Sequence, residues 1–147
     1  MKTVREQLRY DTPRLVVEAG KPFEIIFEND DVMPHNLLVV APGSKAEIGT
    51  LAQTMPPAVD EHGRAYVPKT PKVLAATKML EPDQRETLKM TAPTVPADYD
   101  YVCTFPGHWT IMNGLLVVTR DIEGYLRDHP NAPTIVPVTT APSALGN

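Results

Sequence analysis

The distribution of proline limits the fold of this chain more than any other feature of its sequence. The 147 residues include sixteen prolines and eight glycines, and the prolines are spread along the whole chain. Proline fixes φ and lacks a backbone N–H donor, so it interrupts helices and is excluded from the middle of a sheet. The segments between prolines are short, which favours strands joined by fixed turns over a bundle of long helices.

Short apolar and alternating segments between the turns predict the strands. Phe23, Ile25 and Phe27 lie two residues apart, the spacing of one face of a half-buried strand. The predicted strands are residues 14–19, 23–28, 35–40, 73–77, 85–90, 99–103 and 114–119. We therefore expect an all-β protein, a Greek-key β-sandwich of about seven or eight strands.

The remaining segments predict one helical insertion and two irregular regions. Ser44 and Glu47 have the spacing of a capping box, which predicts a helix of about two turns through Ala52. Residues 55–71 are rich in proline and are expected to wrap around the sandwich as an insertion. Residues 1–120 are the expected domain, and residues 121–147 are expected to form a helical turn followed by a Pro-rich tail or linker.

Charge and cysteine content exclude several classes of protein. The formal net charge of −4 and the lack of a basic cluster argue against nucleic-acid binding. No apolar run approaches the roughly 20 residues that a membrane-spanning helix needs, and the N-terminus lacks the apolar core of a signal peptide. The single cysteine excludes an intramolecular disulfide and zinc patterns built on paired cysteines. We expect a monomer that does not insert into a membrane.

The segment Cys103-Thr-Phe-Pro-Gly-His108-Trp-Thr-Ile-Met112 carries the chemistry. A thiolate, an imidazole and a thioether are soft ligands that favour copper. A second histidine would complete the two His, one Cys and long axial Met of a blue-copper site. His35, at the start of a predicted strand, is the candidate for it.

The spacing of Cys103 and His108 requires the loop to fold back. Five extended residues span roughly 16 Å, which is too far for two ligands of one metal. Pro106 and Gly107 lie between the two ligands and supply a fixed φ and an unusually permissive backbone. We therefore expect a compact ligand loop between two strands.

These residues resemble the cupredoxin family, and the azurins within it most closely. The ligand loop at 103–112 keeps the azurin spacing before Met112, and Val32-Met-Pro-His-Asn36 resembles the first-ligand segment. The resemblance, which covers most of residues 10–119, implies a cupredoxin-like fold and one copper ion that cycles between Cu(I) and Cu(II). It implies the four ligands His35, Cys103, His108 and the weak axial Met112.

The resemblance also implies roles for residues around the ligands. Asn36 would tie the two ligand loops together near Thr104, and the backbone N–H groups of Asn36 and Phe105 would donate to the Cys103 sulfur. His108 would be the electron port on the solvent side. An apolar docking patch around it would include Val32, Met33, Phe105, Pro106 and Trp109.

Three differences from the azurins stand out. Pro34 replaces the glycine before the first histidine, so its carbonyl is a possible weak contact to copper. Trp109 replaces a small residue beside the port, and the azurin disulfide is missing. The flanks of the chain look like those of azurin-like domains in larger bacterial multidomain proteins, some with haem and dehydrogenase modules.

The family resemblance implies a single-electron carrier rather than an enzyme, outside the cytoplasm in the periplasm or at the cell surface. Its expected partners are redox proteins such as c-type cytochromes, or a fused or separate dehydrogenase. Two alternatives remain: a copper-binding or storage module, and an electron-relay domain of a larger oxidoreductase.

Val102 stands where multicopper enzymes place a histidine before the cysteine, so no catalytic second copper is expected. A Cys103–His108 nucleophilic pair is disfavoured by the axial methionine, and His62 and His129 are expected to be exposed histidines.

Overall fold

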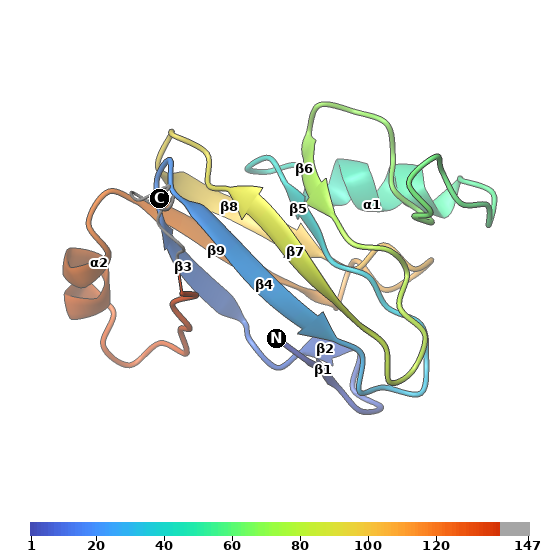
Figure 1. Cartoon of the computed structure of the whole chain (residues 1–147), viewed down its shortest axis with the longest axis horizontal. Helices are drawn as coiled ribbons and strands as arrows, with labels where there is room; N and C mark the ends of the chain where they lie inside the picture. The colour runs from blue at the N-terminus through green and yellow to red at the C-terminus, as the bar shows by residue number, and fades with distance from the viewer. Residues whose placement is uncertain (139–147) are drawn as a thin grey trace, which may run out of the picture.

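The computed structural model describes residues 1–138, which form two packed sheets with a helix at either end (Figure 1). The strands are β1 (Thr3–Val4), β2 (Arg9–Tyr10), β3 (Arg14–Glu18), β4 (Pro22–Glu28), β5 (Leu38–Val40), β6 (Val73–Ala76), β7 (Arg85–Thr91), β8 (Ala97–Val102) and β9 (Asn113–Thr119). The helices are α1 (Lys45–Gln53) and α2 (Ile122–Asp128).

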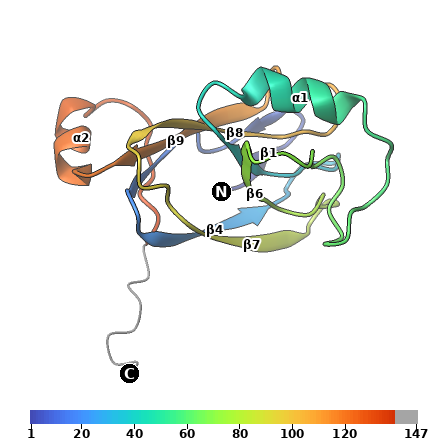
Figure 2. The same ribbon diagram turned by 90° about the horizontal axis from the view of Figure 1, so that it is seen from above.

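The two main sheets form the layers of a sandwich. One has the strand order β3-β9-β8-β5-β6, and the other pairs β4 with β7. Strands β3 and β9 are parallel, while the other pairs of the two layers are antiparallel. Figure 2 shows β4 and β7 lying across from β8 and β9. The predicted Greek-key sandwich is confirmed.

The main core fills the space between the layers, and alternation along the strands directs side chains into it. Phe23, Ile25 and Phe27 of β4 are buried, whereas Ile26 between them is exposed. In β7, which pairs with β4 along its whole length, Leu88 is buried between exposed neighbours. The period of two in the sequence therefore predicted the inward face of β4 correctly.

A second, smaller core lies on the outer face of the five-stranded sheet. Leu38 and Val40 of β5 pack there against Ile48 of α1, with Trp109 at the edge. Because both faces of β5 are covered, all three of its residues are buried, unlike the residues of a half-exposed strand. Helix α1 therefore packs directly against the sheet that carries the ligand loop.

The predicted capping box is wrong, although the helix itself is confirmed. The Ser44 side chain makes no capping hydrogen bond. Glu47 instead accepts a hydrogen bond from Lys72 Nζ at 2.6 Å. A partner 25 residues away in the sequence thus takes the carboxylate that a local cap would have used.

The chain ends add structure to the sandwich edges. The N-terminal strands β1 and β2 form a small antiparallel hairpin that the sequence patterns did not predict. At the other end, the expected helical turn is α2, and the following segment reaches β3, where Ile135 N donates to Arg14 O at 3.2 Å. The end of the predicted tail, residues 139–147, lies outside the described residues. The boundary at residue 120 remains a prediction.

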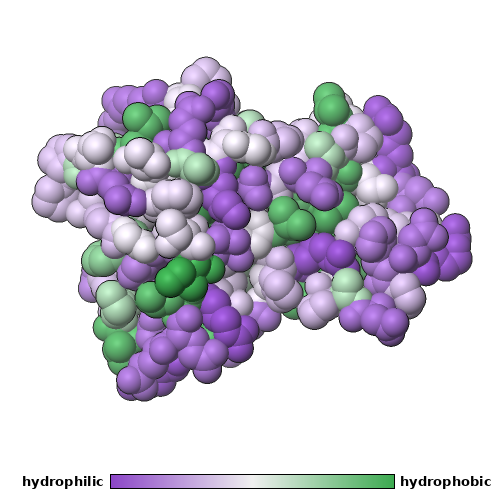
Figure 3. Space-filling model, turned by 180° about the vertical axis from the view of Figure 1, so that it is seen from behind, coloured by the Kyte–Doolittle hydropathy of each residue, from purple (hydrophilic) through white to green (hydrophobic). Residues whose placement is uncertain are grey.

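The surface is mostly polar with separate apolar patches. Figure 3 shows such patches between hydrophilic side chains on the face opposite to that of Figure 1. Within residues 1–138, neither helix has the length and apolar character that a membrane span requires.

Candidate metal centre

The ligand loop joins β8 to β9 and folds back on itself as expected. Cys103 N donates to Met112 O at 3.1 Å, which closes the base of the loop. His108 N donates to Phe105 O at 2.9 Å across a tight turn. Gly107 in this turn has a φ of +89°, in the left-handed region that favours glycine. The loop therefore returns His108 to the side of Cys103.

Three ligand atoms converge at this place. Within residues 1–138, a single cluster of potential metal ligands was found, His35, Cys103 and His108, whose ligand atoms all lie within 4.8 Å of one another. The Cys103 Sγ lies 3.7 Å from Nδ1 of His35 and 3.7 Å from Nδ1 of His108. His35 and Cys103 are completely buried, and His108 is 5% exposed.

His35 arrives from a different element, as the sequence predicted, but it lies before β5 rather than within it. Its backbone forms an isolated antiparallel bridge with Leu80, with N–H···O distances of 3.1 and 2.8 Å. Its ring presents Nδ1 to Cys103, while Nε2 lies 2.6 Å from Asp31 Oδ2. The two ring nitrogens therefore face different partners.

Asp31 is a site residue that sequence reasoning missed. It is buried, and its Oδ1 accepts hydrogen bonds from the backbone N–H groups of Glu6 at 2.8 Å and Val32 at 2.7 Å. Burial by itself raises the pKa of Asp31, but these donors and His35 outweigh it, so the pKa is lowered. The only available signal was an acidic residue four positions before His35.

Burial also decides the protonation of Cys103 and His108. It raises the pKa of the Cys103 thiol to about 11, against the opposing effect of the backbone N–H groups of Asn36 and Phe105. Burial lowers the pKa of His108, and the neighbouring His35 adds to this effect. Without metal, the site therefore holds a protonated thiol and a neutral His108 at neutral pH.

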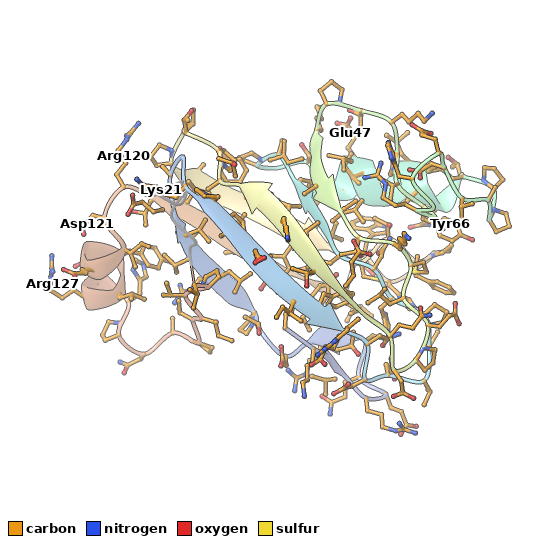
Figure 4. All side chains as sticks on the ribbon, viewed as in Figure 1. Lys21, Glu47, Tyr66, Arg120, Asp121 and Arg127 are labelled. Atoms are coloured by element: carbon orange, nitrogen blue, oxygen red, sulfur yellow. The ribbon has the colours of Figure 1, made fainter. Side chains whose placement is uncertain are left out.

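Asn36 and Thr104 join the two ligand segments directly. Asn36 Nδ2 donates to Thr104 Oγ1 and Thr104 N donates to Asn36 Oδ1, both at 2.8 Å. Thr104 Oγ1 in turn donates to the Tyr66 carbonyl at 2.6 Å. Figure 4 labels Tyr66 at the end of the molecule away from α2. The irregular segment 55–71 therefore supports the loop that carries Cys103.

The other predicted site residues differ in their burial and contacts. Met112 is completely buried, and the Phe105 ring lies 4.7 Å from the His108 ring. Val32, Met33 and Pro106 are exposed, and Pro34 is half-buried.

The Trp109 indole packs on α1, where a Cβ added to Gly49 would lie 2.2 Å from Trp109 Cγ. Its Nε1 donates to Gln53 of the same helix. His62 and His129 are exposed, as predicted.

The chemistry of these residues fits copper. Two imidazoles and a thiol surround one point, and a buried methionine lies on the same loop. This soft set, with two nitrogens and one sulfur in close approach, is the one that type 1 copper proteins use.

Comparisons with known proteins agree with this chemistry. Residues 1–119 match the family model of copper binding proteins of the plastocyanin/azurin family. Auracyanin-A of Chloroflexus aurantiacus is 29% identical over 117 residues, which cover 77% of this chain and 68% of the relative. Outer membrane protein H.8 of Neisseria gonorrhoeae is 29% identical over 117 residues, which cover 74% of this chain and 61% of the relative.

A solved structure supports the same assignment. Auracyanin A from Chloroflexus aurantiacus, described as a "blue" copper protein, has a TM-score of 0.71 and 30% identity, covering 80% of this chain and 94% of that chain. Cupredoxins such as auracyanin are electron carriers rather than enzymes, and the family binds one copper ion. With the family match spanning residues 1–119, the chain belongs to the plastocyanin/azurin family of copper-binding proteins.

Proposed function

We propose that this chain carries single electrons between redox proteins, using one copper ion held by His35, Cys103, His108 and, as a weak axial ligand, Met112. When bound, the copper supplies a one-electron Cu(I)/Cu(II) couple. The convergence of three buried ligand atoms within 4.8 Å is the observation that carries this proposal. The carbonyl of Pro34 is a possible further weak contact.

The surroundings of the ligands favour electron transfer because they leave little freedom to move. The paired hydrogen bonds of Asn36 and Thr104 link the two ligand segments. The backbone bridge between His35 and Leu80 fixes the first histidine to a neighbouring segment. A site held in this way needs little reorganisation when its charge changes, which supports rapid exchange of one electron.

His108 is the proposed port for the electron. It is the ligand with measurable exposure, and the loop around it exposes Pro106 and Gly107. We propose that Val32, Met33 and Pro106 form the docking patch, with half-buried Trp109 at its edge. Exposed apolar side chains beside a port fit a transient partner that excludes water on contact.

The proposed partners are redox proteins such as c-type cytochromes or a dehydrogenase. We propose that the chain is a monomer and meets these partners outside the cytoplasm. The name of the relative Outer membrane protein H.8 supports such a location. Two alternative functions are storage of copper and electron relay within a larger oxidoreductase. Storage is disfavoured by the buried ligands, which offer a metal-accepting protein little access.

Stopped-flow mixing of the reduced protein with an oxidised c-type cytochrome tests the proposal. We expect a fast second-order reaction that Met33→Glu slows several-fold, since the charge enters the docking patch. Val95→Glu is the matched control, because Val95 is also exposed. Val95 lies before the start of β8 and Cys103 follows its end, so Val95 and Cys103 are at opposite ends of this strand. Slow, salt-independent reactions with every cytochrome and dehydrogenase tried would favour storage.

A further inference from the structure

The polar segment before His35 contains a buried carboxylate for which the four-ligand site does not account. The Asp31 side chain is 1% exposed and the His35 side chain is 0% exposed. Their Nε2···Oδ2 distance of 2.6 Å is that of a short, charge-assisted hydrogen bond. A carboxylate in this position can act on whatever the other ring nitrogen binds.

The geometry fixes which nitrogen carries the proton. An ionised carboxylate only accepts hydrogen bonds, so Nε2 of His35 must be the donor. Nδ1, which faces Cys103 Sγ at 3.7 Å, then keeps its lone pair for a metal. Hydrogen bonding of a ligand histidine to a carboxylate orients the ring and raises its basicity.

The N-terminal hairpin holds the carboxylate in place. The Glu6 N–H, in the turn between β1 and β2, donates to Asp31 Oδ1. Thr3 Oγ1 donates to Asn29 Oδ1 at 2.9 Å, and the same oxygen accepts from Asp31 N at 3.0 Å. Asp31 Oδ1 therefore accepts from the backbone and Oδ2 lies against His35. The Asp31 side chain cannot turn away from His35 without losing these hydrogen bonds.

Within residues 1–138, no lysine or arginine forms an ion pair with Asp31. Its ion-pair partner there is His35. The adjacent Asp30 differs, since its side chain is half exposed and lies 3.8 Å from Lys2 Nζ. The field of a buried, unscreened charge reaches a neighbouring ion far more strongly than that of a surface charge.

We propose that Asp31 is a positioning residue for the copper site, which fixes His35 with Nδ1 toward the metal and lowers the reduction potential by favouring the more positive Cu(II) state. This inference rests on the proposed function. One electron enters the site on reduction, from a redox protein partner, and the carboxylate retains its charge throughout. A negative charge beside the metal opposes that electron, so its loss must raise the potential.

Asp31→Asn, with Asp30→Asn as its matched control, tests the proposal. Both variants remove one acidic charge from neighbouring residues, but only the first alters the contact with His35. The measurements are the midpoint potential by voltammetry and the affinities of the copper-free protein for Cu(II) and Cu(I). For Asp31→Asn we expect Cu(II) affinity to fall about 10–100-fold. We expect Cu(I) affinity to fall about tenfold less, which corresponds to a potential about 59 mV higher.

The same measurements separate positioning from a merely structural role. Loss of a residue that only stabilised the fold would lower the affinities for Cu(I) and Cu(II) equally and leave the reduction potential unchanged. A potential for Asp31→Asn equal to that of Asp30→Asn would overturn the proposal, while the wild-type visible band would still support the copper carrier. Absence of that band in the wild type would instead overturn the proposed function.

A measurement on the unaltered chain covers the case in which Asp31→Asn does not fold. Nitrogen-15 NMR of the copper-free protein, in which no metal dictates the tautomer, reports which nitrogen of His35 carries hydrogen. We expect a downfield, slowly exchanging proton on Nε2, since this nitrogen is buried against Asp31. A His35 ring with its proton on Nδ1 would overturn the proposal.

Discussion

At the scale of single residues, the main effect of the fold is on protonation. The Cys103 thiol has no exposed surface, and burial raises its pKa to about 11. A thiol is a poor ligand until it loses its proton. Copper binding at neutral pH must therefore release the proton that burial has kept on the sulfur.

Proton release on copper binding measures this effect. At about pH 8, below the Cys103 pKa of about 11, we expect each bound Cu(II) to release about one proton from the thiol. Apparent affinity should rise about tenfold for each pH unit until the pH approaches that pKa. An indicator dye or pH-stat titration detects the proton. Cys103→Ser should lose this proton, and no release from the wild type would show that the thiolate exists before metal binds.

Single residues were predictable where a local motif identifies them. Cys103, His108 and Met112 lie in one segment of ten residues, and the three-dimensional structure brings the first two together with His35. Asp31 was not predictable in the same way, because its contact depends on a chain path that no period or spacing reveals. Its backbone donors include Glu6, which is 25 residues away in the sequence.

At the scale of elements, the cross-link between the two ligand segments is the central contact. Asn36 precedes β5 and Thr104 follows β8, and these strands are neighbours in the large sheet. Their paired hydrogen bonds are buried, so water cannot replace them readily. The cross-link therefore joins the start of β5 to the end of β8.

Asn36→Ala should destabilise the copper-free protein by about 1–3 kcal/mol, since it leaves the buried Thr104 N–H without its acceptor. Denaturant unfolding followed by circular dichroism measures this loss. Asn131→Ala, at an exposed position, should change stability by less than about 0.5 kcal/mol. Equal stabilities for the two variants would show that the cross-link contributes nothing.

Elements were predictable where the apolar pattern was strong. All seven predicted strands are present, with β5 shorter than expected because His35 lies in an isolated bridge. The hairpin of β1 and β2 was missed because each strand has two residues and its turn places Glu6 and Leu8 at positive φ, where glycine is the usual signal. The capping box failed because Ser44 has helical dihedrals and its side chain makes no cap, while Glu47 pairs with Lys72.

At the scale of the whole molecule, the metal centre and the C-terminal segment occupy different ends. The labelled Arg120, Asp121 and Arg127 lie at the end opposite Tyr66 (Figure 4). Arg14 of β3 joins α2 and the following segment to the sandwich, through hydrogen bonds to the Tyr125 hydroxyl at 2.8 Å and to Thr134 Oγ1. The site residues all precede this segment in the chain.

Deletion of residues 121–147 should therefore separate stability from copper binding. We expect the shortened chain to lose about 1–3 kcal/mol, because the hydrogen bonds to Arg14 disappear. It should keep its visible copper band, as the predicted domain boundary at residue 120 requires. Thermal unfolding and absorption spectroscopy measure the two properties. Loss of colour in a folded, shortened chain would move the boundary beyond residue 120.

The optical titration of the copper-free protein with Cu(II) tests the proposed site most directly. We expect an intense visible thiolate-to-copper band that saturates at about one equivalent, because Cys103 Sγ lies 3.7 Å from a nitrogen of each of two imidazoles. Cys103→Ser should abolish the band, and His62→Ala, which changes an exposed histidine, should leave it intact. A band that survives Cys103→Ser, or a wild-type protein that stays colourless, would contradict a blue copper site at these residues.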